Sequence, residues 1–294
     1  MSTAAAERYG ARFRRVLEYV DAHPDEKLDV EGLSGIAAFS KCHLHRQFSE
    51  LLGVGVHRYI SLKRLKRASY QLAFRGDLPI TDIALTSGYE GPEAFARAFK
   101  RIVGQSPSGF RKAPQWSDWH ACFQPLGGVR RRIMSARYRI DEVRIVTFEE
   151  TRVAALDYRG DTRSIGNAIR AFIAWRTQND LSPRVSATFN IVHHHPAGGE
   201  EGDCHYELCA STDRGVPENS LGVVEKLIPA GRCALLRHVG SDDHLAEPVS
   251  FLYSQWLPQS GEELRDFPLY FQRVRFFPDV PEHEAVTDIF LPLK

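Results

Sequence analysis

Apolar side chains recur every three or four residues through the first 112 positions, which predicts an all-helical region. A first helix over residues 8–22 ends before His23-Pro24, because the residue that precedes a proline avoids helical backbone angles. The helices expected after it cover, in order, residues 30–37, 41–52, 56–74, 80–87 and 92–103.

Two segments of this helical region repeat each other. A short helix, a tight turn and a longer helix occupy residues 30–52 and again residues 80–103, an order typical of a helix-turn-helix. The copies align at an offset of 50 before the turn and 51 after it, so the second turn is one residue longer. Gly53 and Gly104 end the longer helices, where glycine readily adopts the backbone that a helix end requires.

The longer helix of each copy carries an arginine at the equivalent place. Arg46 and Arg97 lie between apolar anchors four residues apart and therefore on the opposite helix face. An arginine there can donate to N7 and O6 of guanine in a major groove. Most arginines on a helix surface are solvated or paired locally, but two at matching places favour DNA contact.

From residue 139 the apolar period changes to that of strands. A series of strand, helix and further strands occurs twice in this region. The repeated order predicts an α+β domain with a mainly antiparallel sheet and two pseudo-symmetric halves. The second of its helices is expected to end at Pro258. Strands are expected within 140–158 and over 185–193, 204–209, 221–227, 233–238, 269–276 and 286–291, with helices over 165–177 and 245–256.

Prolines and glycines between the two regions predict a linker. Trp116 and Trp119 fall inside it and are expected to dock on one of the domains. The predicted division is therefore an all-α tandem helix-turn-helix domain over 1–113, a linker over 114–137 and an α+β domain over 138–294.

Charge separates the two regions further. Residues 1–137 hold 22 Lys and Arg against 13 Asp and Glu, whereas residues 138–294 hold 16 against 24. A basic region is attracted to polyanions such as DNA, and an acidic one is not. Charges that merely solvate two surfaces would give the same counts, so charge alone leaves both interpretations open.

The helical region resembles a known family of regulators. Residues 83–111, which contain SGYEGPEAFARAFKRIVGQSPSGFR, look like the second half of an AraC/XylS-type DNA-binding domain, and residues 33–53 look like the first half. The resemblance implies two recognition helices that enter successive major-groove segments about 34 Å apart. It implies base-reading roles for Cys42, His45, Arg46, Glu93 and Arg97, and phosphate contacts from Lys41, Lys63, Arg64, Lys100, Arg101, Arg111 and Lys112.

Two of these positions carry open alternatives. Glu93 is equally suited to accept a hydrogen bond from cytosine and to interact with its own helix N-terminus. Pro92 stands at a matching position but offers at most an apolar contact to a thymine methyl group.

Residues 140–294 resemble the GyrI-like effector-binding domain, most specifically in the motif WLPQSG. The resemblance implies a regulatory sensor with an aromatic cleft between its halves, in which many family members hold a buried glutamate for cationic ligands. Gln272 takes that place here, and an amide has no charge to pair with a cation. A neutral or amphipathic effector is therefore equally expected. The pocket candidates are Trp175, Phe189, Tyr206, Trp256, Tyr270 and Gln272, although aromatic residues at such places are more often core.

Metal binding and catalysis are not expected. His193-His194-His195 with Cys204-His205 invites a zinc site, but consecutive strand residues point to alternate faces, so solvated histidines at a hairpin tip explain the run better. The chain has no GxSxG, P-loop, HExxH or GxGxxG motif, and Gln272 replaces the carboxylate that would activate water. We therefore expect no enzyme, no cofactor and no metal ion.

Other features bear on location and partners. No apolar run approaches the roughly 18 residues of a membrane span, the N-terminus shows no secretory pattern, and five scattered cysteines suggest reduced thiols, so we expect a cytoplasmic protein. The predicted function is a sequence-specific transcription regulator modulated by a small molecule. Its expected partners are double-stranded DNA and that effector, with RNA polymerase as a further candidate. The alternatives are a GyrI-like enzyme and a protein-interaction module, each tethered to the DNA-binding domain.

Overall fold

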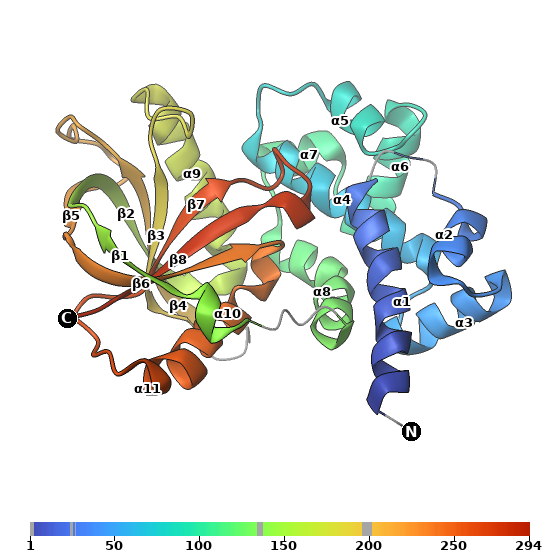
Figure 1. Cartoon of the computed structure of the whole chain (residues 1–294). Helices are drawn as coiled ribbons and strands as arrows, with labels where there is room; N and C mark the ends of the chain where they lie inside the picture. The colour runs from blue at the N-terminus through green and yellow to red at the C-terminus, as the bar shows by residue number, and fades with distance from the viewer. Residues whose placement is uncertain (1–2, 24–25, 27, 134–137, 196–201) are drawn as a thin grey trace. The chain divides into compact units, whose positions relative to one another are not determined.

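The computed structural model describes the whole chain except residues 1–2, 24–25, 27, 134–137 and 196–201 (Figure 1). The chain divides into two compact units, one of residues 1–135 with 281–283 and one of residues 136–280 with 284–294. Among the described helices, none has the length and apolarity that crossing a membrane requires. The helices of the first unit are α1 Thr3–Ala22, α2 Val30–Ala37, α3 Lys41–Leu52, α4 Val56–Phe74, α5 Ile80–Thr86, α6 Pro92–Val103, α7 Pro107–Lys112 and α8 Trp116–Ile133.

The two helix-turn-helix units are confirmed, with different chemistry in their turns. α2 ends at Ala38 in the left-handed region, and the hydroxyl of Ser40 accepts the amide of His43 at 3.3 Å to start α3. In the second unit Gly88 takes the left-handed position at φ 73°, and Pro92 occupies the first turn of α6.

Both longer helices anchor in one helical core. Leu44 and Phe48 of α3 and Phe95 and Phe99 of α6 have no exposed surface. Phe48 packs edge-on against Tyr59 of α4 at 5.4 Å between ring centroids, so the connecting helix holds the first unit as predicted.

The structure differs from the predicted linker. Residues 116–133 form α8, which continues through Pro125. Its buried side chains follow a helical spacing of three and four residues, and Trp116 stacks on Phe74 of α4 at 5.6 Å. Burial of four large side chains in the core of the first unit outweighs the one backbone bond that proline removes. The four are Trp116, Trp119, Phe123 and Leu126. The expectation that the two tryptophans dock on a domain is confirmed.

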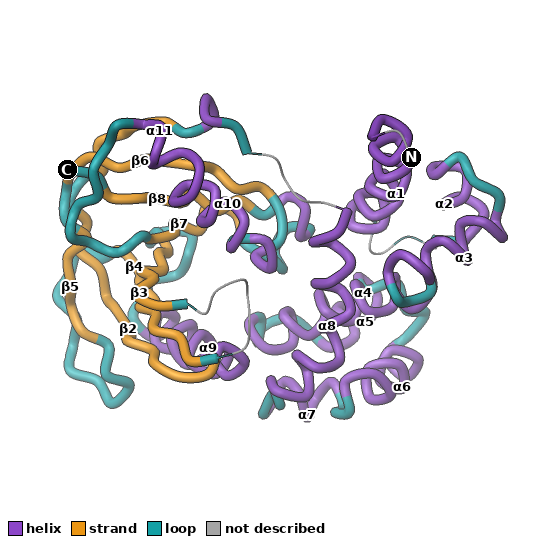
Figure 2. Tube along the Cα trace, turned by 90° about the horizontal axis from the view of Figure 1, so that it is seen from below, coloured by secondary structure: helices purple, strands orange, loops and turns teal. Residues whose placement is uncertain are grey.

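The second unit is a curled, eight-stranded antiparallel sheet with helices against it. The strand order is β1-β6-β8-β7-β3-β4-β2-β5, which places β7 and β3 in the middle of the sheet. Figure 2 shows the sheet with α9 and α10 beside it. Its elements are β1 Arg144–Phe148, β2 Thr151–Asp161, α9 Ile165–Gln178, β3 Thr188–His194, β4 Asp203–Ser211, β5 Val224–Ile228, β6 Gly231–Val239, α10 Ala246–Phe251, α11 Leu257–Ser260, β7 Tyr270–Arg275 and β8 Val286–Pro292.

The two halves of this sheet exchange their first strands. β1 belongs by sequence to the first half but pairs with β6 of the second, and β5 of the second half pairs with β2 of the first. The halves meet where β3 pairs with β7. Strands β1 to β4 of the first half correspond to β5 to β8 of the second. When each strand is replaced by its counterpart, the strand order is the same read from either edge, which confirms the predicted pseudo-symmetry.

The second helical segment differs from the prediction that Pro258 ends it. A π-helical turn, Leu252–Trp256, joins α10 to α11, and the helix continues to Ser260. Pro258 is the second residue of α11 and has no amide to donate to the preceding turn. The wider turn before it, with the amide of Leu257 donating to Leu252, accommodates the proline.

Both helical segments lie on the same face of the sheet. Leu156 and Leu208 pack with Phe172 of α9, while Leu236 and Ile289 pack with Phe251 of α10. The opposite face carries a cluster that is rich in aromatic side chains and draws on both halves. That face therefore offers aromatic side chains from both halves to a ligand.

Candidate DNA interface and ligand site

The base-reading candidates lie on the solvent side of α3 and α6. Cys42, His45 and Arg46 are exposed on α3, and Glu93 and Arg97 are exposed on α6. Among the residues that the structure describes, neither Arg46 nor Arg97 has a hydrogen bond or an ion pair that would hold its guanidinium. Both are therefore available to a ligand outside the domain.

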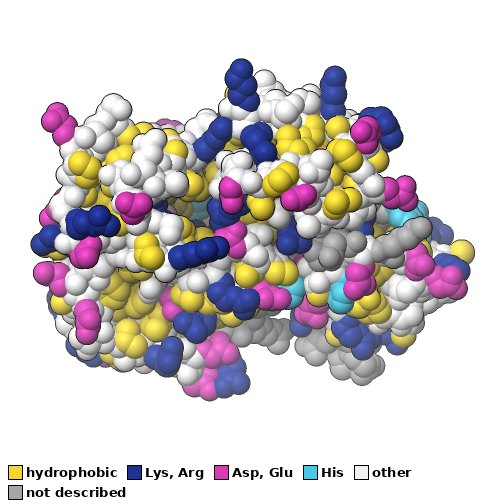
Figure 3. All heavy atoms as spheres, turned by 90° about the horizontal axis from the view of Figure 1, so that it is seen from above, with side chains coloured by type: hydrophobic (Ala, Val, Ile, Leu, Met, Phe, Trp, Pro, Cys, Tyr) yellow, Lys and Arg dark blue, Asp and Glu magenta, His cyan; other side chains and the backbone are white. Residues whose placement is uncertain are grey.

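The seven phosphate candidates fall into two groups. Lys100 and Arg101 are exposed in the last turn of α6, and Lys112 is exposed at the end of α7. Lys41 is exposed but forms an ion pair with Glu31 at 2.9 Å. Figure 3 shows Lys and Arg side chains mixed with Asp and Glu over the visible face, so the basic excess is not gathered into one patch there.

The other three candidates are less exposed and make contacts inside the domain. Lys63 is 10% exposed and pairs with Asp21 at 2.9 Å. Arg111 donates to the backbone carbonyl of Leu78 at 2.6 Å. Arg64 donates to the backbone carbonyl of Glu26. These internal contacts make the three side chains less available to phosphate, although each has further N–H donors.

Arg64 has a structural position that the sequence did not reveal. Its guanidinium lies so close to Gly88 that a Cβ added there would come within 2.8 Å of Cζ. It thus joins α4 to the turn of the second helix-turn-helix and, through Glu26, to the segment before α2. No sequence pattern marks this contact, because its members are distant along the chain.

The pocket candidates of the second unit divide between the two faces of the sheet. Phe189, Tyr270 and Gln272 share the face opposite the helices, as their strand registers show. Tyr206 and the two tryptophans lie on the helix side, with Trp175 and Trp256 in separate hydrophobic clusters. The structure therefore brings together three of the six candidates.

Aromatic rings fill the middle of the face that these three share. Tyr270 stacks on Phe290 at 5.0 Å, and Phe148 packs edge-on against both. Tyr270 is fully buried and Phe189 is 3% exposed, so burial raises the pKa of the Tyr270 phenol. A ligand that reaches these rings has to separate them.

Two buried carboxylates that were not among the predicted site residues flank the aromatic cluster. Glu207 and Asp288 occupy pseudo-equivalent positions on β4 and β8, opposite Asp157 and Arg237 respectively. Each carboxylate meets a cation: Lys226 contacts Glu207 at 2.8 Å, and Arg237 binds both oxygens of Asp288 at 2.7 Å. Tyr270 and Gln272 share a face because side chains alternate along a strand, and Asp288 pairs with Gln272. The sequence would have placed Asp288 on this face only if the strand pairing had been known.

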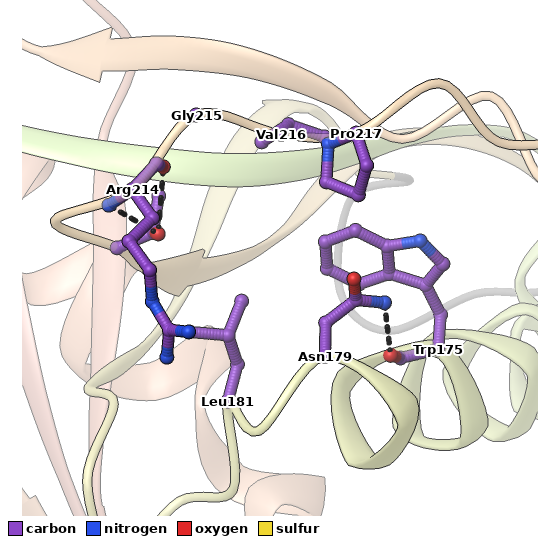
Figure 4. Close-up of a pocket in the computed structure, with 8 residues that line it drawn as sticks. Trp175, Asn179, Leu181, Arg214, Gly215, Val216 and Pro217 are labelled. Carbon is purple, nitrogen blue, oxygen red and sulfur yellow. Dashed lines mark hydrogen bonds between the residues drawn. The ribbon is translucent and has the colours of Figure 1, made fainter.

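Trp175 borders a separate hollow of about 250 Å³ at the end of α9. Figure 4 shows its indole ring facing Pro217, beside the amide of Asn179, which donates to the carbonyl of Trp175 at 2.8 Å. Leu181 and the loop over residues 212–217 complete the lining. This hollow lies on the helix side and does not include the aromatic cluster.

Two helix-turn-helix units on one connecting helix, followed by a sheet with an aromatic face, define a DNA-binding regulator with a ligand-binding domain. The GyrI-like small molecule binding domain matches residues 141–294, and a helix-turn-helix domain matches residues 33–113. The chain belongs to the GyrI-like family and carries an AraC-type helix-turn-helix domain. The predicted family, fold class and regulatory role are confirmed.

Similar proteins include named regulators. The probable transcriptional regulator YgiV of Escherichia coli (strain K12) is 32% identical over 153 residues, which cover 52% of this chain and 96% of that protein. The right origin-binding protein of the same organism is 30% identical over 138 residues, 47% of this chain and 45% of that protein. The EcmrR–DNA complex in EcmrR-RPo is a solved structure with 15% identity and a TM-score of 0.45, covering 90% of this chain and 98% of its own.

Proposed function

We propose that this regulator reads a bipartite DNA site with α3 and α6 and that a small molecule bound on the aromatic face of the sheet changes its occupancy of that site. The proposed DNA reading is supported by Arg46 and Arg97, which are both exposed at equivalent positions of two equivalent helices. Each guanidinium is free to form two hydrogen bonds with a guanine.

Charge on the aromatic face supports an effector that is neutral or amphipathic. Gln272 is uncharged, and the carboxylates of Glu207 and Asp288 are already paired with Lys226 and Arg237. A cationic effector would have to displace one of these partners and leave it without its counter-charge. An aromatic, weakly polar molecule meets no such cost and stacks on the rings.

The regulatory step follows from ligand thermodynamics. An effector shifts a DNA-binding equilibrium only if it has different affinity for the free and the DNA-bound conformations. We infer no catalytic role for this domain and include RNA polymerase as a candidate partner. Because a regulator acts in the compartment that holds the DNA, the cytoplasmic location expected from the sequence remains part of the proposal.

The decisive experiment selects bound sequences from a random duplex pool with the full-length protein. We expect an enriched site whose halves lie one helical turn apart, and a binding constant that falls steeply with salt, with a logarithmic slope of about −0.9 per phosphate contacted. Salt-sensitive binding with no enriched sequence would make the helical domain a nonspecific anchor and would contradict the proposal.

A second experiment tests the effector and separates the alternatives. Thermal stability of the full-length protein is measured with an aromatic quaternary ammonium compound and with its uncharged carbon isostere. We expect the uncharged compound to stabilise the native protein at least as well, and the Gln272→Glu variant to reverse that order. Turnover of a compound would favour the enzyme alternative, and failure of every small molecule to stabilise the protein would favour the interaction module.

A further inference from the structure

A cluster of titratable side chains lies on the first half of the sheet, on the same face as the aromatic rings. His193 on β3 contacts Glu207 on β4, with 2.8 Å between Nε2 and Oε1. His205 on β4 contacts Asp157 on β2, with 2.6 Å between Nε2 and Oδ1. The two imidazole rings stack at 4.2 Å between centroids. The described contacts therefore join three adjacent strands through two histidines and two carboxylates.

We propose that His193, His205 and Glu207 bind a divalent transition-metal ion of the zinc type. Each of the three offers one ligand atom, and these atoms all lie within 4.8 Å of one another. Metal bonds of 2.0–2.2 Å in a tetrahedral site place ligand atoms about 3.3 Å apart, so binding requires side-chain movements that bring these atoms closer together. Two imidazoles with one carboxylate form a ligand set that suits zinc, nickel, copper and iron.

The environment of the cluster suits a metal ion better than solvated histidines. The Glu207 side chain is only 7% exposed, and its Oε1 already meets two potentially cationic groups, His193 and Lys226, both at 2.8 Å. The position therefore favours positive charge, and a metal ion would replace the contact with Lys226. The Asp157 carboxylate accepts from Nε2 of His205, the arrangement by which a second carboxylate orients a metal-bound imidazole. Stacked rings cannot both aim at one ion, and His193, whose side chain is 30% exposed, has the room to turn.

This set differs from the one that the sequence suggested. Strict alternation along a strand excludes three consecutive histidines as ligands of one ion. A β-bulge between Val192 and His194 breaks that alternation and pairs His194 with His205, but His194 is not among the residues whose ligand atoms come together. The structure combines one histidine of the run with His205 and Glu207 of the next strand. The ion would therefore tie β3 to β4 just before their connection.

The test is titration of full-length protein with Zn²⁺ by calorimetry and with Co²⁺ by visible absorption, under reducing conditions. We expect one ion per chain, with d–d absorption typical of nitrogen and oxygen ligands. His205→Gln and Glu207→Gln should each weaken binding at least a hundredfold. The matched control is His194→Gln, which changes a neighbouring histidine outside the cluster and should leave the affinity unchanged.

Two further variants keep the test informative. Asp157→Asn, at a side chain that is 42% exposed, should weaken binding by about tenfold or more without disturbing the core. Lys226→Met removes the cation that competes for Glu207 and should tighten metal binding. Equal loss of affinity in His194→Gln and His205→Gln would assign the ion to the histidine run and overturn the proposal. Absence of saturable binding, or unchanged binding in Glu207→Gln, would overturn it as well.

Discussion

The basic side chains of the helical domain are of two kinds: some form contacts within the domain, and others are exposed and available to DNA. Arg64, Lys63 and Arg111 serve internal contacts, whereas Arg46 and Arg97 are exposed on their helices. The sequence identifies helix faces well, because a period of 3.6 residues determines them. The sequence does not show which side chains distant along the chain come into contact. Those contacts determine which arginines remain available to bind DNA.

Arg46→Ala and Arg97→Ala should each weaken binding to the selected site by about 1–3 kcal/mol and change binding to random DNA little. The physical reason is the loss of bidentate hydrogen bonds to a base rather than of a phosphate contact. Fluorescence anisotropy on both DNAs measures the difference, with Arg15→Ala, an exposed arginine of α1, as the matched control. Equal losses on the two DNAs would assign both arginines to phosphate.

Gly88→Ala should lower the free energy of unfolding by about 1–3 kcal/mol. Its φ of 73° disfavours any residue with a Cβ, and the new methyl group would push the Arg64 guanidinium aside. The control is Gly76→Ala, since an added Cβ there meets nothing within 4 Å. Urea unfolding of both variants measures the two effects, and equal stability would show that the contact with Arg64 is unimportant.

His238 should make the second unit sensitive to acid. Burial lowers its pKa, although the hydrogen bond to the Ser241 carbonyl at 3.0 Å acts in the opposite direction. The ring also contacts the Tyr138 hydroxyl at 2.7 Å. The unfolded chain therefore binds a proton more readily, so stability is complete above a pH of about 6.5 and is lost as the pH falls below it. Urea unfolding between pH 7.5 and 5 should show a smaller loss for His238→Gln than for the wild type. An identical loss would place the sensitivity elsewhere.

At the scale of elements, most helices of the first unit could be predicted to within a residue or two, and the strand order could not. Helix ends are local events set by Gly53, Gly104 and Ser40. Pairing of β1 with β6 depends on residues almost ninety positions apart, which no local pattern reports. The same lack of pairing information explains why only three of the six ligand-site candidates come together. The face of the sheet on which a strand residue lies depends on strand pairing and on where the helices pack.

α8 shows that prolines and glycines can lead a sequence-based prediction to miss a helix. Pro125 and the glycines after it indicated a linker, whereas the spacing of Trp116, Trp119, Phe123 and Leu126 already contained a helical stripe. The outcome shows that burial of large aromatic side chains outweighs a local helix breaker. The stripe was the stronger signal.

Trp119→Ala should therefore destabilise the helical domain by about 3–5 kcal/mol, because it removes a side chain that packs on Tyr70, Trp116 and Phe123. Gln124→Ala, exposed on the same helix, is the control. Thermal unfolding followed by circular dichroism distinguishes them. Equal melting temperatures would mean that α8 contributes little to the domain.

For the whole molecule, the strand exchange makes each half of the sheet dependent on the other. A fragment over 138–220 lacks β6, the partner of β1, and a fragment over 221–294 lacks β2, the partner of β5. We expect each fragment alone to lack cooperative unfolding and the mixture to recover the native near-ultraviolet spectrum. A fragment that unfolds cooperatively as a monomer would contradict this dependence.

The same exchange carries an evolutionary implication. A half-length chain with this topology could complete its sheet only with a second copy of itself, each copy lending its first strand to the other. Joining two such copies in one polypeptide would turn an obligate dimer into a monomeric domain and free the two copies from identity. The present chain shows that freedom: one copy pairs Asp157 with Glu207 beside two histidines, while the other pairs Arg237 with Asp288. Such a joining would allow the residues of one copy to diverge while those of the other stayed unchanged.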